Sequence, residues 1–368
     1  MIKFLKKIVF SFNVLAIVLL LGSYASTIIS PKDFWPIVFL GLAFPFLIII
    51  NLAFVIVWGL RFNRRALYSA IALLIGYSHI QHTVQFNSEK SSTENKDHQL
   101  KIVSYNTALF GYYQSKWYVP EMVEKINELK PDVLCVQEFL NLGEQGNTTL
   151  DSIKQACNFK YSYFENLNDG RKKGRYGIAI LSNHELKHKG IVKFNHSTGN
   201  MCIYADIAID SNTYRIYNLH LQSFRFKKKD FQFAEKLPED NNEKLAQSKN
   251  IISRMKRAYT KRAEQVHDLK EQFDSLQIPY FVIGDFNDPP VSYAYQALSK
   301  NLKDAFVERG SGLGRTYIGA MPNFRIDYIL YPKSFEGVTY KAHELKSDHK
   351  MLETTIKYWG KPHAFFTT

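Results

Sequence analysis

Polar side chains that can bind a cation or move a proton stand at the ends of several apolar runs. Glu138 closes the run DVLCVQE, and Asp285 and Asn287 follow the run PYFVI in the motif GDFND. In an extended chain, residues two positions apart point to the same side, so Asp285 and Asn287 can act on one water molecule. Carboxylate and amide oxygens are the ligands that Mg²⁺ prefers, and a carboxylate can take a proton from water. The spacing therefore predicts a metal-assisted hydrolytic site.

The carboxyl-terminal part of the chain adds a histidine and two further aspartates. The segment SDH contains Asp348 and His349, and the segment RIDYIL contains Asp327. A histidine that is oriented by an aspartate can polarise a phosphate or act as a general base, and Asp327 is the candidate for that aspartate. Each residue alone is more simply explained as an ordinary surface or strand-end side chain. The prediction therefore depends on the whole set.

The elements that must position these residues are short apolar runs rich in β-branched and aromatic residues, which predict strands. Four of them carry polar residues near their carboxyl ends, at Asn106, Glu138, His220 and Asp285. We therefore expect one end of a sheet assembly to collect the functional groups. The predicted strands are 101–107, 132–138, 177–183, 201–209, 213–221, 279–286 and 325–332.

Two stretches between these runs, 119–129 and 243–273, have helical periodicity. The segment from Phe224 to Phe273 opens with RFKKKDF and continues into a helix dense in lysine and arginine. One explanation of these charges is a solvated helix face. The alternative is an arm that faces phosphate or membrane, because the segment directly follows a strand that carries His220.

Seven motifs occur in a fixed order, namely SYN, QE, GIAILS, NLH, GDFN, RIDYI and SDH. In this order they resemble the endonuclease/exonuclease/phosphatase superfamily over about residues 100–358. This superfamily includes deoxyribonuclease I, neutral sphingomyelinases and inositol polyphosphate phosphatases. The resemblance implies a four-layered α/β sandwich, in which two mixed β-sheets are flanked by helices. It also implies a site for Mg²⁺, or for Mn²⁺ in its place, at one end of the sandwich.

The resemblance assigns the metal to three residues of this sequence. Glu138 would be the main Mg²⁺ ligand, assisted by Asn106, and Asp348 would make a further metal contact.

The resemblance assigns the catalytic work to five other residues. Asp285 and Asn287 would position and activate the nucleophile or the phosphate. His349, oriented by Asp327, would contact the scissile phosphate or act as the base, so the role of base is shared between Asp285 and His349. His220 would donate to a phosphate oxygen or to the leaving group. Abasic-site endonucleases carry tyrosine at this position, which argues against that activity.

The amino-terminal part of the chain is far more apolar and predicts membrane helices. Residues 8–29 and 36–60 are each long enough to cross about 30 Å of hydrocarbon. A third run, 66–84, ends in polar residues and is a weaker candidate. A signal peptide would explain the first run, but this run exceeds a typical signal core and further apolar runs follow it.

The charges around these runs predict their orientation. Lysines precede the first run, and Arg61, Arg64 and Arg65 follow the second, so both flanks are expected in the cytoplasm. With three spans the rest of the chain lies outside the cytoplasm, and with two spans it lies inside. We expect a multi-pass protein of the cytoplasmic membrane with an extracytoplasmic catalytic domain. The expected organisation is a transmembrane region of two to three helices at 1–86, a flexible linker at 87–99 and a catalytic domain at 100–368.

Composition limits the partners of the protein. The chain has 368 residues, with 47 lysines and arginines against 34 acidic residues and a net charge of +13. This surplus favours polyanions such as nucleic acid, phosphoinositides or an anionic bilayer surface, although a solvated basic surface also explains it. The three cysteines have no metal-binding spacing.

Two functions follow from these observations. The first is a membrane-anchored phosphodiester or phosphomonoester hydrolase that acts on nucleic acid, phospholipid head groups or inositol phosphates. The second is a membrane-tethered binding module with the same fold and no catalysis. The complete set of polar residues favours the enzyme, because a scaffold has no use for so many converging groups. The sequence indicates no obligate protein partner.

Overall fold

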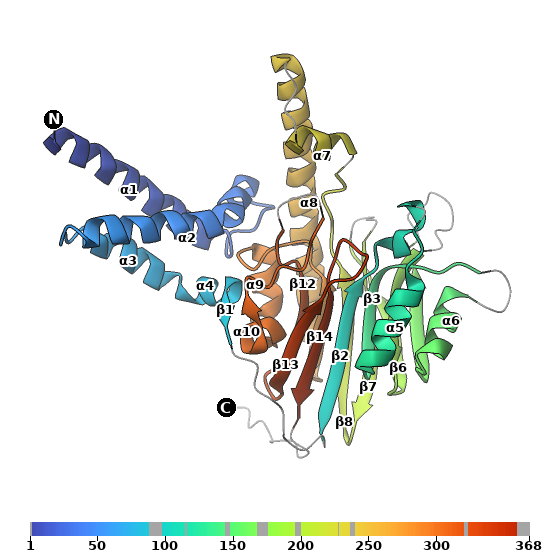
Figure 1. Ribbon diagram of the computed structural model, residues 1–368. Coiled ribbons are helices and arrows are strands. Elements are labelled where there is room, and N and C mark those ends of the chain that lie inside the picture. The colour runs from blue at the N-terminus through green and yellow to red at the C-terminus, as the bar shows by residue number, and fades with distance from the viewer. Residues whose placement is uncertain are drawn as a thin grey trace.

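The computed structural model describes residues 2–87, 98–114, 116–143, 148–167, 176–195, 200–226, 228–235, 240–319 and 323–358. Most of the predicted linker, and the end of the predicted catalytic domain after residue 358, lie outside these ranges. A group of helices at the amino terminus adjoins an α/β domain (Figure 1).

The amino-terminal helices include two of membrane-spanning length among the described residues. Helix α1 spans Ile2–Ala25, and α2 spans Val38–Gly59 after a short 3-10 helix at Trp35–Ile37. The third apolar run forms two shorter helices, α3 (Ala66–Ile75) and α4 (Tyr77–Thr83), which meet at Gly76. The weakest predicted span is therefore not one continuous helix.

Polar side chains hold α1, α2 and α3 together. The amide of Asn13 donates to the Ser69 hydroxyl at 2.6 Å, and that hydroxyl donates to Asn51 Oδ1 at 3.1 Å. Asn13 also accepts from the Trp58 indole at 3.0 Å. Asn13, Asn51 and Ser69 are fully buried. Interhelical hydrogen bonds of this kind fix helix pairs where the surroundings are apolar.

The α/β domain contains all seven strands that the sequence predicts. They are β2 (Gln99–Asn106), β3 (Val133–Leu140), β5 (Tyr176–Ser182), β7 (Met201–Ile209), β8 (Asn212–His220), β9 (Tyr280–Asp285) and β12 (Asp327–Pro332). Five further strands complete the sheets, namely β4 (Tyr161–Asn166), β6 (Leu186–Val192), β10 (Leu302–Asp304), β13 (Glu336–His343) and β14 (Met351–Lys357). A separate small ribbon pairs β1 (Gln85–Phe86) with β11 (Ser311–Gly312).

Two six-stranded sheets pack face to face. Their strand orders are β13-β14-β2-β3-β5-β4 and β10-β12-β9-β8-β7-β6. Both sheets are mixed, because β2 is parallel to β3 and β8 is parallel to β9 while the other pairs are antiparallel. Side chains such as Cys135, Ile180, Ile203 and Ile283 form the dry core between them.

Helices cover the outer face of each sheet. Met122 and Ile126 of α5 (Val119–Leu129) and Ile153 of α6 (Thr149–Ala156) join the core outside the β2–β3 sheet. On the other sheet, Val266 and Leu269 share a cluster with Tyr217. These two residues belong to α8 (Asn241–Ser275), and α9 (Tyr293–Ser299) lies beside it. The shorter helices are α7 (Lys228–Glu235) and α10 (Ala305–Arg309). Helix, sheet, sheet and helix make the four-layered sandwich, so the predicted fold class is confirmed.

The basic helix of the sequence is α8, and its two halves differ. Its amino-terminal half projects beyond the sheets (Figure 1). Arg262, in the carboxyl-terminal half, is buried and pairs with Asp288 at 2.9 Å. Arg254, in the amino-terminal half, pairs with Asp230 at 3.0 Å. These two arginines therefore serve the structure, while Lys256 lies over the ring of Trp35, 5.7 Å from its centroid.

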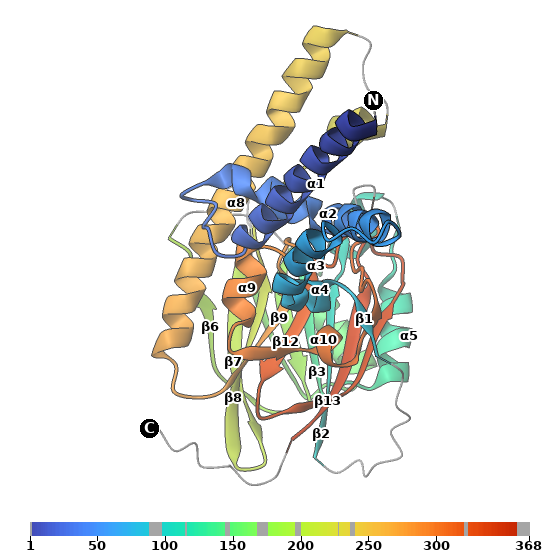
Figure 2. The ribbon, with the colours of Figure 1, turned by 90° about the vertical axis from the view of Figure 1, so that its left-hand side faces the viewer.

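Helix α2 begins against the α/β domain, and Figure 2 shows the helical group beside α8 and α9. Ile37 and Val38 share a buried cluster with Tyr259 of α8. A Cβ placed on Gly41 would lie 2.5 Å from the carbonyl oxygen of Val291, so only glycine allows this approach. Where α4 ends, Arg325 donates to the carbonyl oxygen of His82 at 2.7 Å.

Candidate active site

Strand register brings the predicted site residues to one edge of the sandwich. His220 at the end of β8 pairs with Asp285 at the end of β9, and Asp285 pairs in turn with Asp327 at the start of β12. In the other sheet, Asn106 ends β2 opposite Gln137 of β3. Parallel strands place their carboxyl ends at the same edge, which explains why residues far apart in sequence meet here.

A bulge in β3 aims Glu138 into the site. The pairing of β3 with β5 shifts register between Val136 and Phe139, and Glu138 has a positive φ of 46°. An inserted residue re-aims a side chain, and left-handed backbone in a residue other than glycine is uncommon and clusters at functional sites. Gln137 beside it donates to Asn218 at 2.7 Å across the two sheets, which fixes the strand at this level.

Asp285 is the most heavily hydrogen-bonded carboxylate of the edge. Asn106 donates to its Oδ2 at 3.0 Å, and Asn287 donates through its backbone N–H at 2.8 Å and its side chain at 3.2 Å. Gly284 precedes it with φ +130°, and a Cβ there would meet the Leu219 carbonyl oxygen at 2.1 Å. The glycine therefore lets β9 approach β8 closely enough to place Asp285.

His349 and Asp327 form the pair that the sequence suggests. Asp327 Oδ2 lies 2.9 Å from Nδ1 of His349, and both side chains are buried. The Ser347 hydroxyl accepts from the backbone N–H of His349 and donates to the carbonyl of Asn106. The ring of Tyr317 packs edge-on against His349, 5.2 Å between centroids. The imidazole is therefore held on several sides, with Nε2 turned toward Asp285 at 3.9 Å.

Burial and local charge give the two histidines opposite protonation states. Burial lowers the pKa of His220 below its usual range, although Asp285 opposes this. Burial would also lower the pKa of His349, but the charges of Asp327 and Asp285 outweigh it and raise that pKa to about 10. At neutral pH His220 is therefore uncharged, and His349 is a cation that can donate from Nε2.

The carboxylates of the edge are crowded. Burial and the charge of Asp327 raise the pKa of Asp285. Burial and then Asp348 raise the pKa of Glu138, against the opposing charge of His349. Like charges held close together are costly unless a cation or a proton compensates them. The donor set therefore fits a divalent metal ion.

Two sets of residues could hold that ion. Asp285, Asp327 and His349 present ligand atoms within 4.8 Å of one another, but Nδ1 of His349 and the carboxylate of Asp327 already contact each other at 2.9 Å. Glu138 and Asp348, with the amide oxygen of Asn106, offer oxygen donors of the kind Mg²⁺ prefers.

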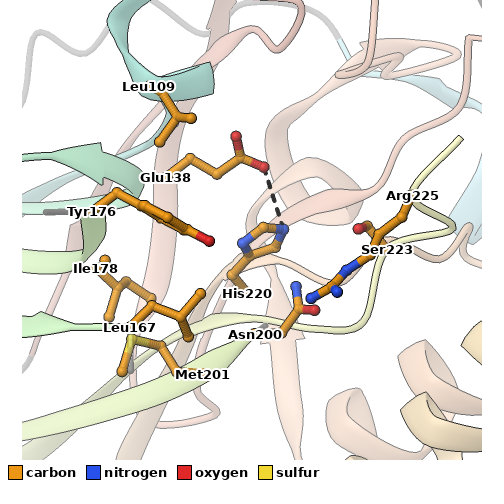
Figure 3. A pocket seen from close by; sticks show the side chains of 11 residues that line it. Leu109, Glu138, Leu167, Tyr176, Ile178, Asn200, Met201, His220, Ser223 and Arg225 are labelled. Atoms are coloured by element: carbon orange, nitrogen blue, oxygen red, sulfur yellow. Dashed lines mark ion pairs between the residues drawn. The ribbon is translucent and has the colours of Figure 1, made fainter. Parts of the chain in front are cut away.

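All eight residues singled out from the sequence lie at this edge. Nε2 of His220 is 3.7 Å from Glu138 and 3.6 Å from Asp285, and the first of these contacts is drawn in Figure 3. Asp348 is the exposed member and lines the cavity with His349.

Two cavities meet at Glu138 and His220. The larger has a volume of about 670 Å³ and reaches from this edge of the sandwich to α2. The smaller, of about 300 Å³, also adjoins His220 and lies between Tyr176, Met201 and Arg225 (Figure 3). Ser223 and Arg225 line both cavities.

Sequence reasoning missed several residues of the site. Tyr317 lies in a segment with no strand-like or helical signal, and Arg225 is one cation among many in RFKKKDF. The α2 residues that line the larger cavity were missed, because the sequence of an apolar helix does not indicate the surface against which the helix packs. Gly41, a glycine within an apolar span, was the available signal, since such a glycine commonly marks a close contact.

Comparison with known proteins agrees with this fold. Residues 103–349 match the Endonuclease/Exonuclease/phosphatase family, and residues 6–83 match a domain of unknown function (DUF8431). No curated protein matches the chain.

Three solved structures illustrate the shared fold. The endonuclease/exonuclease/phosphatase from Bacteroides vulgatus is 14% identical, with a TM-score of 0.52 over 71% of this chain and 99% of its own. The human Nocturnin catalytic domain with bound sulfate is 17% identical, with a TM-score of 0.50 over 71% and 94%. The 2′,3′-cyclic phosphatase ANGEL2, in complex with adenosine-2′,3′-vanadate, is 13% identical, with a TM-score of 0.50 over 75% and 99%. The family match covers well over half of the sequence, and the chain belongs to the endonuclease/exonuclease/phosphatase family.

Proposed function

We propose that the chain is a Mg²⁺-dependent phosphoester hydrolase of the nuclease or phosphodiesterase type, anchored in a membrane. The observation that carries the proposal is the convergence of four carboxylates, two amides and two histidines on one concave edge. The family supports phosphoester hydrolysis in general. The cyclic phosphatase among the structural neighbours supports a phosphate ester as substrate.

Each catalytic side chain has a role that its surroundings favour. Asp285 is placed to accept a proton from the attacking water, because its raised pKa makes it a stronger base than an ordinary aspartate. The protonated His349, held by Asp327, donates from Nε2 to a phosphate oxygen. The sequence left the role of base open between Asp285 and His349, and the protonation of His349 favours Asp285.

The remaining side chains position the substrate and the metal. Neutral His220 donates to a phosphate oxygen or to the leaving group, and Asn287 holds Asp285 in place. Glu138, Asn106 and Asp348 would hold Mg²⁺, with Mn²⁺ as a substitute. A bound divalent cation would neutralise negative charge on the phosphate.

The amino-terminal helices would form the membrane anchor, with residues 1–86 as the transmembrane region, 87–99 as the linker and 100–368 as the catalytic domain. Arg65 lies over the rings of Phe10 and Trp58, at 4.3 and 5.1 Å, so the arginine-rich loop and the start of α1 share one end of the helical group. The α/β domain contacts the other end, at Gly41. By the positive-inside rule, this arrangement supports a catalytic domain outside the cytoplasm.

The test is hydrolysis of bis-p-nitrophenyl phosphate by the full-length protein in detergent. We expect activity that requires Mg²⁺ or Mn²⁺ and falls about a thousandfold in Glu138→Gln, because the substitution removes the main negative ligand. Glu121→Gln is a matched control, since Glu121 lies on α5 outside both cavities.

Two outcomes would count against the proposal, the first against the enzyme and the second against its metal. Well-folded protein that cleaves none of bis-p-nitrophenyl phosphate, plasmid DNA, phospholipid or inositol phosphates with either metal would indicate the binding module. Equal rates with and without chelator would remove the metal from the proposal. Glu138→Gln must unfold at the same temperature as the wild-type protein, so that its loss of activity can be assigned to the chemistry of the site.

A further inference from the structure

The larger cavity joins two walls of opposite character. One wall holds the polar groups of the catalytic edge, including Glu138, His220 and His349. The other wall is apolar and belongs to α2, a helix of membrane-spanning length. The α2 residues that line it are Phe39, Leu42, Ala43 and Phe46.

These four residues follow the spacing of one helix face. Positions separated by three, four and seven residues lie in line along a helix, so the α2 wall is a stripe about 10 Å long. Phe46 is 63% exposed at the far end of the stripe, although it belongs to an apolar span. The stripe therefore runs from the catalytic edge to the surface that the bilayer would cover.

Apolar side chains of the α/β domain face this stripe. Phe224, Met255 and Tyr259 line the cavity opposite α2, and Ile326 lines it beside the catalytic edge. Arg225 is the only lysine or arginine among the described lining residues. A nucleic acid groove would instead carry many cations along the backbone path.

The second cavity supplies a place for the other substituent of a phosphodiester. It adjoins His220, and Arg225 points from one wall toward Asn200 and His220 (Figure 3). A phosphorus atom held at Glu138 and His220 would thus adjoin both the α2 cavity and a smaller cavity, in which apolar side chains are joined by the polar groups of Asn200, Ser223 and Arg225.

We propose that the substrate is a membrane phospholipid, whose acyl chains lie along the stripe Phe39–Phe46 of α2 while its head group occupies the cavity beside Arg225. The proposal rests on the function proposed above and names its substrate class. In the reaction, water adds its oxygen to phosphorus and one P–O ester bond breaks. Asp285 takes a proton from the attacking water and releases it to solvent, and the leaving oxygen gains a proton from solvent, which gives an alcohol and a phosphomonoester.

The docking of α2 makes a sharp test possible. Gly41→Val would push α2 away from Val291, whereas Gly59→Val on the same helix meets nothing within 4 Å. Full-length protein in mixed micelles with phosphatidylglycerol should lose phospholipid hydrolysis about tenfold relative to bis-p-nitrophenyl phosphate hydrolysis in Gly41→Val. The ratio should be unchanged in Gly59→Val.

A second pair of variants tests the stripe itself. Phe46→Ala should lower the same ratio about tenfold, because acyl chains lose an apolar contact. Phe12→Ala is the matched control, since Phe12 on α1 is 62% exposed and lies outside the cavity.

A readout without turnover completes the test. Metal-free Glu138→Gln protein in nanodiscs, irradiated with a phospholipid that carries a diazirine in its acyl chain, should crosslink to Met255 and Phe224 of the domain wall. Crosslinks confined to the outer faces of α1 and α2 would overturn the proposal.

The two proposals fail in different ways. Cleavage of bis-p-nitrophenyl phosphate or plasmid DNA without cleavage of phospholipid would overturn the lipid substrate alone. Equal effects of Gly41→Val on phospholipid and on bis-p-nitrophenyl phosphate would do the same. Wild-type protein that cleaves no phosphate ester would overturn both.

Discussion

The candidate active-site edge and the flank formed by β13, β14 and α10 treat buried and partly buried carboxylates in opposite ways. At the edge, the pKa values of Glu138 and Asp285 are raised, because burial and neighbouring acids outweigh the nearby histidines. On the flank, burial would raise the pKa of Glu353, but His343 and Lys101 lower it. Hydrogen bonds likewise lower the pKa of Glu308 against its burial. The flank pairs its carboxylates with cations and hydrogen-bond donors, which stabilises the fold. The edge keeps carboxylates whose negative charge a bound metal ion would compensate.

Backbone conformation shows the same contrast. At the edge, Glu138, Gly284 and Asn287 all have positive φ, at 46°, 130° and 53°. Residues 336–343 and 351–357 of the flank contain no described residue with positive φ. In Glu138 and Asn287, which are not glycines, this conformation is strained and persists only where the surrounding structure holds it in place. We therefore expect substitutions at the edge to have the larger effects.

The largest effect is expected where the backbones of β8 and β9 meet. Gly284→Ala would place a Cβ 2.1 Å from the Leu219 carbonyl oxygen. We expect it to destabilise the protein by about 3 kcal/mol and to abolish activity by moving Asp285. The measurement is thermal unfolding in detergent, followed by intrinsic fluorescence.

Gly312→Ala is the matched control for this substitution. Gly312 also has positive φ, at 70°, but a Cβ there meets nothing within 4 Å. It should cost only about 1 kcal/mol, which is the conformational penalty alone. Similar losses in both variants would show that backbone conformation, and not the approach of β9 to β8, controls stability at the edge.

The next effect concerns the orientation of His349. Asp327→Asn should lower kcat about a hundredfold with little change in KM, because it removes the charge that keeps His349 protonated. The loss should grow as the pH rises, since the pKa of His349 would fall from about 10. The measurement is a pH profile of kcat for both proteins.

A double-mutant cycle separates orientation from an independent role. If Asp327 acts through His349, then Asp327→Asn should add little in a His349→Gln background. Fully additive losses would mean that Asp327 has a function of its own, such as binding the metal with Asp285.

The sequence predicts the interior of the fold better than its margins. The seven strands recognised from apolar runs include the central members of both sheets. Strands β4, β6, β10 and β13 were missed, and each lies at a sheet edge, where solvent exposure removes the apolar pattern. Strand β14 is central but carries Glu353, Thr354 and Thr355, which are buried because β13 and Lys101 supply partners.

The site residues were recognisable because they follow apolar runs in a fixed order. Their mutual distances were not, since His220 and Asp327 meet Asp285 only through the register of β8, β9 and β12. The α2 wall depends on the docking of Gly41 against Val291, which no local pattern encodes. The order of the site residues along the chain therefore indicates the type of reaction, whereas the walls of a substrate cavity depend on contacts between distant segments.

The smallest effect is expected on the flank, where Glu353 accepts a hydrogen bond from His343 at 2.9 Å. Because the folded-state pKa of Glu353 lies below its unfolded value, its stabilising contribution is complete above the unfolded pKa and is lost as the pH falls through the folded pKa. Glu353→Gln should therefore cost about 1 kcal/mol near pH 7 and nothing in strong acid. Thermal unfolding of both proteins across this range is the measurement. A loss that stays constant with pH would assign the role of Glu353 to packing, and the contrast between flank and edge would no longer be electrostatic.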